Sequence, residues 1–310
     1  MPGRGCVIIP LRSELKALER SRRAAVPVGD NNNMPRGEIS NDDYERFCRY
    51  LETASGITLG ANKAYLVSSR LNRIMEEAGV SGLGALVKKL EQGASPTLKV
   101  KVVDAMTTNE TLWFRDEYPF ELLKDMILPE LGGQRPQPIR FWSAACSSGQ
   151  EPYSISMTIS EFQQSRPGVL QVPVQIVATD ISASMLKQAR AGIYDELELN
   201  RGLSPERRVR FFTKEEKKLK VRAEVAARVE YRELNLLQSY GGLGQFDVVF
   251  CRNVLIYFSN DNKRDILSRI ARTLRPGGYL FLGGSEPIVN YSQQFEMVRS
   301  ARGVAYRLIR

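Results

Sequence analysis

The sequence of 310 residues contains no histidine. This absence excludes Ser-His-Asp and Cys-His catalysis, histidine general bases and zinc sites with histidine ligands. The four cysteines (Cys6, Cys48, Cys146 and Cys251) are scattered and lack the spacing of a metal site. A disulfide framework is not expected in a chain of this length. We therefore predict a site without a metal ion.

Long apolar runs are also missing. No stretch approaches the roughly 18 apolar residues of a membrane-spanning helix, and Cys6–Leu11 is too short for the core of a signal peptide. We therefore expect a cytoplasmic protein with no direct membrane insertion. At 43% hydrophobic residues, the chain has enough apolar side chains for one large domain or two smaller ones.

Charge is distributed unevenly along the chain. The net charge is +9, and residues 201–232 contain 11 Lys or Arg but only 5 Glu. A basic segment of this kind favours an acidic partner, which is either nucleic acid or an acidic protein surface.

The first part of the chain divides into a tail and a helical domain. Residues 1–39 have little periodicity, and we expect a disordered tail. Residues 40–106 read as an N-terminal helical domain, which begins at a capping sequence, Ser40–Asp43. Lys63, Arg70 and Arg73 share one face of a helix predicted at about 62–78. This face is either a solvated surface or a docking surface for an acidic partner.

A polar segment, Thr107–Arg115, follows the helical domain. It is either a linker with capping residues or a ligand-facing segment, since its Asn, Thr and Arg side chains offer three kinds of hydrogen-bonding group. With a helix near 117–131 it forms a connecting region over residues 107–135.

Residues 136–310 alternate between predicted strands and helices, which favours a parallel sheet. Ile139–Tyr153 reads as a buried strand, a loop of small residues and a helix start. Such a corner is typical of nucleotide sites, although an ordinary strand-to-helix turn fits equally well because the loop contains one glycine. Asp180 ends the second predicted strand, where a carboxylate accepts hydrogen bonds from ribose hydroxyls.

A basic insertion interrupts the alternating pattern at about 200–233. Leu219–Ala223 and Arg228–Glu233 alternate in character, and we predict that they pair as a small antiparallel ribbon. The positive charge of this insertion favours a role in docking a partner over a solvent-exposed insertion without a function.

Six motifs occur in one order along the chain. They are Thr107–Thr111 with Phe114 and Arg115, Trp142–Ser154, Ala178–Ile181, Asn235–Leu237, Phe246–Phe258 and Leu274–Tyr279. Together they resemble the chemotaxis receptor methyltransferases, the CheR family, over about residues 42–310. A generic methyltransferase would share only the nucleotide-binding corner, the acid and the Pro-Gly-Gly turn.

The resemblance implies an α/β fold with a Rossmann-like methyltransferase domain, an N-terminal all-α domain and a small inserted antiparallel β-subdomain. It implies methyl transfer from S-adenosylmethionine (SAM) to the γ-carboxylate of receptor glutamates, with S-adenosylhomocysteine (SAH) as the second product. The partner would be the cytoplasmic helical domain of methyl-accepting chemotaxis receptors, and we expect a monomer.

The resemblance also implies site residues. The cofactor contacts would be Asn109, Thr111 and Arg115 at the amino-acid end, Glu151 and Asp180 around the loop and ribose, Asn235 and Leu236 at the adenine, and Cys251, Arg252 and Asn253 closing the pocket. Arg252 and Tyr257 would lie nearest the methyl group and the incoming carboxylate. Lys63, Arg70 and Arg73 would face the receptor.

This chemistry needs no histidine. A glutamate is ionised at neutral pH, with a pKa of about 4.3, so it is already a nucleophile. The enzyme has to align the reacting atoms and exclude water. Two alternatives remain: methyl transfer to a nucleic acid or small molecule, and a catalytically silent SAM sensor. The run after Phe250 lacks an Asn-Pro-Pro-Tyr motif, which argues against the first.

Overall fold

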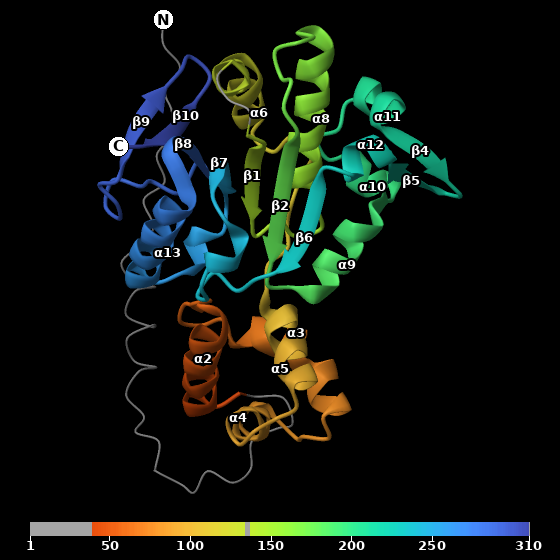
Figure 1. Cartoon of the computed structure of the whole chain (residues 1–310). Helices are drawn as coiled ribbons and strands as arrows, with labels where there is room; N and C mark the ends of the chain where they lie inside the picture. Colours follow the sequence, from red (N-terminus) through yellow and green to blue (C-terminus); the bar gives the residue numbers. More distant parts are fainter. Residues whose placement is uncertain (1–38, 134–136, 310) are drawn as a thin grey trace, which may run out of the picture. The chain divides into compact units, whose positions relative to one another are not determined.

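The structure is a computed structural model that describes residues 39–133 and 137–309 (Figure 1). The predicted tail, except for Ile39, lies outside the described residues. Among the described residues, no helix combines the length and the apolar character needed to span a membrane.

The helical region is built from amphipathic helices around one apolar core. These helices are α2 (Asn41–Ser55), α3 (Ala64–Glu77), α4 (Leu83–Glu91) and α5 (Pro96–Met106). The predicted cap is present, since the Ser40 hydroxyl accepts a hydrogen bond from the Asp43 N–H at 3.2 Å. Phe47, Leu51, Val67 and Leu71 are buried together between the helices, so packing of the apolar faces holds the bundle.

The helix predicted near 117–131 is present as one continuous helix that widens into a π-helical turn in its middle. Its parts are α6 (Tyr118–Leu122), a π-helical turn η1 (Leu123–Ile127) and α7 (Leu128–Gly132). Pro129 explains the π-helical turn. A proline has no N–H to donate, and its ring clashes with the carbonyl four residues earlier, so the preceding turn widens.

A mixed sheet forms the core of the second region. Within the described residues it has seven strands in the order β6-β2-β1-β7-β8-β10-β9. The strands are β1 (Ile139–Ala144), β2 (Val174–Asp180), β6 (Val229–Glu233), β7 (Phe246–Cys251), β8 (Leu274–Leu282), β9 (Phe295–Arg299) and β10 (Val304–Leu308). The strands β6, β2, β1, β7 and β8 pair in parallel, as the sequence predicts. A final hairpin places β10 antiparallel to β8 and β9 antiparallel to β10.

Both faces of this sheet are covered. Phe141 on β1 packs in one apolar cluster together with helix α8 (Gln150–Ser165). Its neighbour Trp142 packs in another cluster with helix α13 (Asn260–Thr273). Successive residues of a strand point to opposite faces of the sheet. A strand with both faces buried therefore needs an almost continuous run of apolar residues, and β1 and β7 have such runs.

The inserted β-subdomain is present, but the strand pairing predicted for it is wrong. Strand β5 (Lys218–Val221) pairs with β4 (Phe212–Glu215) and with β3 (Ile193–Tyr194), after helices α9 (Ala183–Ala191), α10 (Glu196–Leu199) and α11 (Pro205–Phe211). The second predicted ribbon strand is β6, which joins the main sheet beside β2. Helix α12 (Ala223–Ala226) separates β5 from β6, so the two are not hairpin neighbours.

The carboxyl ends of β1 and β2 point toward the helices α2, α3 and α5 (Figure 1). The two regions meet closely there. Helix α2 ends at Gly56 in the left-handed conformation, and a Cβ at this position would lie 2.3 Å from the Phe258 ring. A glycine is therefore required at this contact.

Candidate active site

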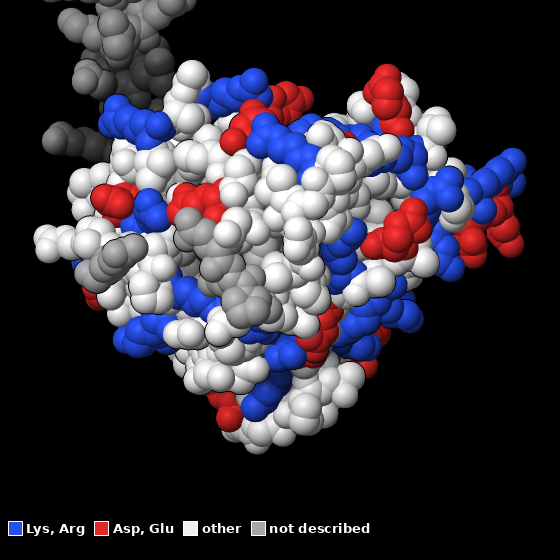
Figure 2. All heavy atoms as spheres, turned by 45° about the horizontal axis from the view of Figure 1, so that its top comes forward, with Lys and Arg blue, Asp and Glu red and all other residues white. Residues whose placement is uncertain are grey.

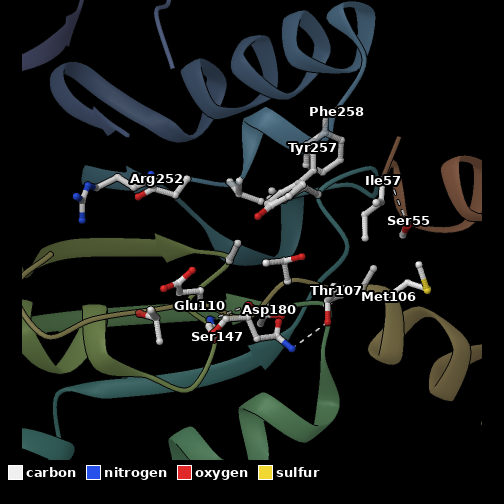
Figure 3. Close-up of a pocket in the computed structure, with 18 of the residues that line it drawn as sticks. Ser55, Ile57, Met106, Thr107, Glu110, Ser147, Asp180, Arg252, Tyr257 and Phe258 are labelled. Atoms are coloured by element: carbon white, nitrogen blue, oxygen red, sulfur yellow. Dashed lines mark hydrogen bonds between the residues drawn. The ribbon is translucent and has the colours of Figure 1, made fainter. Parts of the chain in front are cut away.

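A cavity lies where the helical region meets the carboxyl ends of the parallel strands. Its volume, including the solvent at its mouth, is about 1210 Å³. Figure 3 shows Tyr257 and Phe258 on one side of it, and Asp180, Ser147 and Thr107 on the other. In α/β sheets this end of the strands is where ligands bind.

Asp180 is the buried carboxylate at the end of β2. One of its oxygens accepts the Ser147 N–H at 2.7 Å and the other accepts the Ser182 N–H at 2.8 Å. Burial raises the pKa of Asp180, and these two backbone hydrogen bonds oppose the rise. Ser147 has a left-handed backbone (φ 50°), which turns its N–H toward the carboxylate.

The residues around Asp180 fit SAM. Each carboxylate oxygen has two lone pairs, and a single N–H occupies one of them, so acceptor positions remain for the two ribose hydroxyls. Leu236 and Ile181 supply apolar wall beside it. Asn235 is fixed by donating to the Ala54 carbonyl at 2.8 Å.

Arg252 lies at the centre of an ion network that runs from the interior to the surface. Its side chain is 1% exposed and contacts Asp116 at 2.6 Å and Glu151 at 3.1 Å. It also donates to the Arg115 carbonyl at 2.9 Å. Burial raises the pKa of Glu151, and the charge of Arg252 lowers it. The guanidinium therefore already has two carboxylate partners, and in Figure 3 it extends away from Tyr257.

Tyr257 belongs to a 3-10 turn, η3 (Leu255–Tyr257), which follows β7. Its side chain lines the cavity, and its hydroxyl has no hydrogen-bond partner among the described residues. Figure 3 shows the ring pointing from this turn into the cavity. A free phenol in this position is available to bind a substrate or cofactor oxygen.

The polar segment 107–115 forms another wall. Asn109, Thr111 and Arg115 all line the cavity, as the ligand-facing interpretation of this segment predicts. The Asn109 carbonyl accepts a hydrogen bond from the Ser147 hydroxyl at 2.8 Å, which ties the segment to the loop after β1. Phe114 and Asp116 on either side of Arg115 have left-handed backbones, so the chain turns sharply there.

The remaining predicted residues differ in position. Asn253 and Lys63 line the cavity, whereas Cys251 lies fully buried in the core behind it. Arg70 also lines the cavity, but its guanidinium donates to the Met106 and Thr107 carbonyls at 2.9 and 2.8 Å. Arg73 lies outside the cavity lining, is 88% exposed and pairs with Glu77 at 3.0 Å.

Several lining residues have no signal in the sequence. The last residue of α2, Ser55, lines the cavity, the loop after α2 contributes Ile57 and Thr58, and α5 contributes Met106. Periodicity assigns such residues to a helix or a loop, but only the packing of the helical region against the sheet brings them to the cavity. For Phe258 the sequence does carry a signal, because this residue adjoins Tyr257 in the motif Phe246–Phe258.

Comparison with known proteins decides the family. Residues 42–107 match the family described as CheR methyltransferase, all-alpha domain, and residues 109–304 match CheR methyltransferase, SAM binding domain. The chain belongs to the CheR methyltransferase family.

Relatives in several bacteria agree with this assignment to CheR. A Pseudomonas aeruginosa protein named chemotaxis protein methyltransferase 1 is 58% identical over 273 residues, which cover 86% of this chain and 98% of the relative. Chemotaxis protein methyltransferase 1 of Vibrio cholerae is 54% identical, covering 87% and 98%. The Salmonella typhimurium chemotaxis protein methyltransferase is 36% identical, covering 84% and 88%.

This CheR-family chain is therefore a SAM-dependent chemotaxis protein methyltransferase. The predicted family, fold class, enzyme class and cofactor are all confirmed. When bound, SAM supplies a methyl group that is attached to a good leaving group.

Proposed function

We propose that the enzyme methylates the γ-carboxylate of glutamates in methyl-accepting chemotaxis receptors, and that it acts as a monomer on their cytoplasmic helical domain. The observation that carries this proposal is a cavity whose described residues offer a free phenol, no histidine and no carboxylate without a hydrogen-bond or ion-pair partner. The chain has no histidine, and each of the carboxylates at the cavity already has partners.

These partners are specific. Asp180 accepts two backbone N–H groups, and Glu151 is engaged by Arg252 and by the Ser143 hydroxyl at 2.7 Å. Glu110 pairs with Arg201 at 2.8 Å. An alcohol or amine substrate would need one of them to remove a proton. A glutamate carboxylate, ionised at neutral pH, needs none.

The residues then have positioning roles. Tyr257 would bind one oxygen of the incoming carboxylate, while Arg115 and Asn109 hold the amino-acid end of the cofactor. Arg252 would shape the pocket and balance the charge of Glu151 and Asp116. A strong ion pair with the substrate would hold a charge that has to be lost in the transition state, so a guanidinium with other partners suits this reaction.

We further propose a division of labour along the chain. Residues 40–106 cover the cofactor and face the receptor, residues 107–135 connect, and residues 136–310 bind the cofactor. Lys63 supports the first assignment because it lines the cavity and has no ion pair among the described residues. Arg73 supports a receptor-facing role for residues 40–106 less directly, since Glu77 already neutralises part of the charge of Arg73.

The inserted β-subdomain, at about residues 200–233, is the second proposed docking surface. Lys214, Lys217 and Lys218 on its β4–β5 hairpin have no ion pair among the described residues, whereas Arg207 and Arg208 pair with acids at 2.7 and 2.5 Å. Figure 2 shows basic and acidic atoms side by side at its right edge, where this hairpin projects. The hairpin lysines, rather than the whole basic segment, would steer acidic receptor helices.

The test is an assay with tritiated SAM and membranes that contain receptors. We expect label on the receptor that is released as methanol in mild base, because a methyl ester hydrolyses and an N-methyl group does not. Label that survives base, or that appears on added RNA, would contradict the proposal. Membranes without receptors serve as the control.

A further inference from the structure

The turn that holds Tyr257 is hydrogen-bonded at its beginning and at its end by two residues, Glu286 and Thr58, to which the proposed reaction assigns no role. We call residues 253–257 the Tyr257 turn. It begins at Asn253, a non-glycine residue in the left-handed conformation (φ 58°), and ends in the 3-10 turn η3. Such a backbone persists only where its surroundings hold it.

Glu286 holds the beginning of the Tyr257 turn. It is buried in the loop after β8, and its carboxylate accepts three backbone N–H groups. One oxygen accepts the Asn253 N–H at 2.6 Å and the Gly283 N–H at 2.7 Å, and the other accepts the Ile256 N–H at 3.2 Å. A Cβ at Gly283 would lie 2.6 Å from this carboxylate, so the loop leaves room for it only because the residue is glycine.

Thr58 holds the end of the same turn. The Tyr257 carbonyl accepts the Thr58 N–H at 2.8 Å and the Thr58 hydroxyl at 2.9 Å. Thr58 lies in the loop after α2, so the second support comes from the helical region. Two N–H groups of the turn therefore donate to a carboxylate, and its last carbonyl accepts two hydrogen bonds.

We infer that Glu286 and Thr58 are positioning residues for methyl transfer, which set the place of the Tyr257 hydroxyl in the cavity. This inference rests on the proposed catalytic role of Tyr257. Glu286 lies outside the cavity lining, and Thr58 lines the cavity but donates both its hydroxyl and its N–H to the Tyr257 carbonyl, so both residues act on the backbone of the Tyr257 turn. Through Thr58, the placement of the hydroxyl depends on the helical region being seated against the sheet.

The kinetic test uses a mild variant with a matched control. Thr58→Val removes one of the two hydrogen bonds to the Tyr257 carbonyl. As the control, Thr53→Val removes an exposed hydroxyl near the end of α2 that donates to the Arg49 carbonyl. We expect Thr58→Val to lower kcat roughly tenfold, since small misplacements of a catalytic group are costly, and to change the Kd of SAH by less than about twofold. Thr58→Ser should restore most of the loss, and Thr53→Val should cause none.

A double-mutant cycle shows whether the effect passes through Tyr257. In a Tyr257→Phe background, Thr58→Val and Glu286→Gln should each lower kcat by less than about twofold further, because the hydroxyl they place is gone. Equal losses in both backgrounds, or a Thr58→Val enzyme with unchanged kcat, would overturn the inference. Full turnover by Tyr257→Phe itself would instead refute the proposed role of Tyr257.

A measurement that needs no substrate distinguishes a failure of the positioning role from a failure of the proposed catalytic role of Tyr257. 3-Fluorotyrosine placed at position 257 in the SAH-bound enzyme should give one ¹⁹F resonance, and Thr58→Val and Glu286→Gln should each shift or broaden it. Thr53→Val should leave it unchanged. An identical resonance in every variant would contradict the positioning role even if the receptor assay fails.

Discussion

At the scale of single residues, the site has one buried carboxylate, Asp180, and one largely buried carboxylate, Glu151, and their hydrogen-bond partners differ in kind. Asp180 is held by backbone N–H groups and Glu151 by a guanidinium and a hydroxyl. Burial raises the pKa of both. Asp180 is therefore fixed by the backbone of the loops after β1 and β2, whereas Glu151 depends on Arg252.

Replacing Asp180 tests its role at the cofactor. Asp180→Asn keeps the size of the side chain but turns an NH₂ group toward one of two backbone N–H groups and loses the charge. We expect SAH affinity, measured by calorimetry, to fall at least tenfold, since a hydrogen bond to a charged group contributes about 1.5–3 kcal/mol. Asp261→Asn, on the exposed first turn of α13, should bind normally. An unchanged affinity for Asp180→Asn would remove Asp180 from the site.

The raised pKa of Asp180 predicts a pH dependence of stability. Between about pH 3.9, the ordinary value, and its raised pKa, the folded protein binds more protons at Asp180 than the unfolded chain does. Its contribution to the free energy of unfolding therefore falls as pH rises through this window. Urea unfolding without cofactor should show wild type losing stability relative to Asp180→Asn from pH 4 toward pH 7. A difference that is constant or grows with pH would contradict this.

Tyr257 should affect turnover rather than binding. Tyr257→Phe removes one hydroxyl that has no protein partner among the described residues, so folding and SAH affinity should change little. We expect kcat to fall by about 10 to 100-fold, a loss of about 1.4–2.7 kcal/mol of transition-state stabilisation. The measurement is initial rates at saturating SAM with calorimetry on the same preparation. Wild-type turnover would show that Tyr257 is not catalytic.

At the scale of elements, helix α3 shows that residues on one helical face need not share a function. The guanidinium of Arg70 donates to the Met106 and Thr107 carbonyls, where α5 passes into the segment 107–115 that lines the cavity. Arg73 is a surface residue whose ion pair is exposed, and such pairs are worth about 0–1 kcal/mol.

Separate charge changes on α3 should therefore have separate effects. Arg70→Ala should weaken SAH binding and lower the melting temperature, because two helix-end carbonyls lose their donor. Arg73→Glu should leave both unchanged and raise the KM for receptor, with a weaker dependence of that KM on salt. The measurements are calorimetry, thermal unfolding and initial rates against receptor concentration. Equal effects of both changes would contradict this assignment.

Much of the secondary structure could be predicted from local signals. Ser40 and Ser95 cap helices that carry clear apolar faces, and β1 and β7 read as buried strands. The pairing of β6 could not be predicted, because alternation shows that a segment is a strand but not which strand lies beside it. Long-range packing decided that β6 extends the main sheet.

The candidate site also contains residues that could be predicted from the sequence and residues that could not. Asp180 and the 107–115 segment stood out because their residue types and their places at strand and helix ends carry chemistry. Thr58 and Glu286 carry no such mark, since a threonine after a helix and a glutamate in a loop are ordinary. Their importance follows from partners 199 and 30 to 33 residues away in sequence.

At the scale of the whole molecule, the cavity belongs to neither region alone. The helical region supplies Ser55, Ile57 and Thr58 to one wall, and the sheet supplies Asp180 and Arg252 to another. Hydrogen bonds from Thr58 to Tyr257 and from Asn235 to Ala54 join the two. The enzyme thus completes its site only when both regions are in place, which suits a reaction that has to exclude water from a carboxylate.

The most direct test of the central claim is to map the methyl groups on receptor after incubation with the enzyme and SAM. We predict a mass increase of about 14 Da confined to glutamates of the receptor's helical domain, lost when those glutamates are replaced by alanine, and a kcat/KM that is flat near neutral pH because no base has to titrate. Methylation of lysine, arginine or cysteine, or methylation that persists after the glutamates are replaced, would contradict the account.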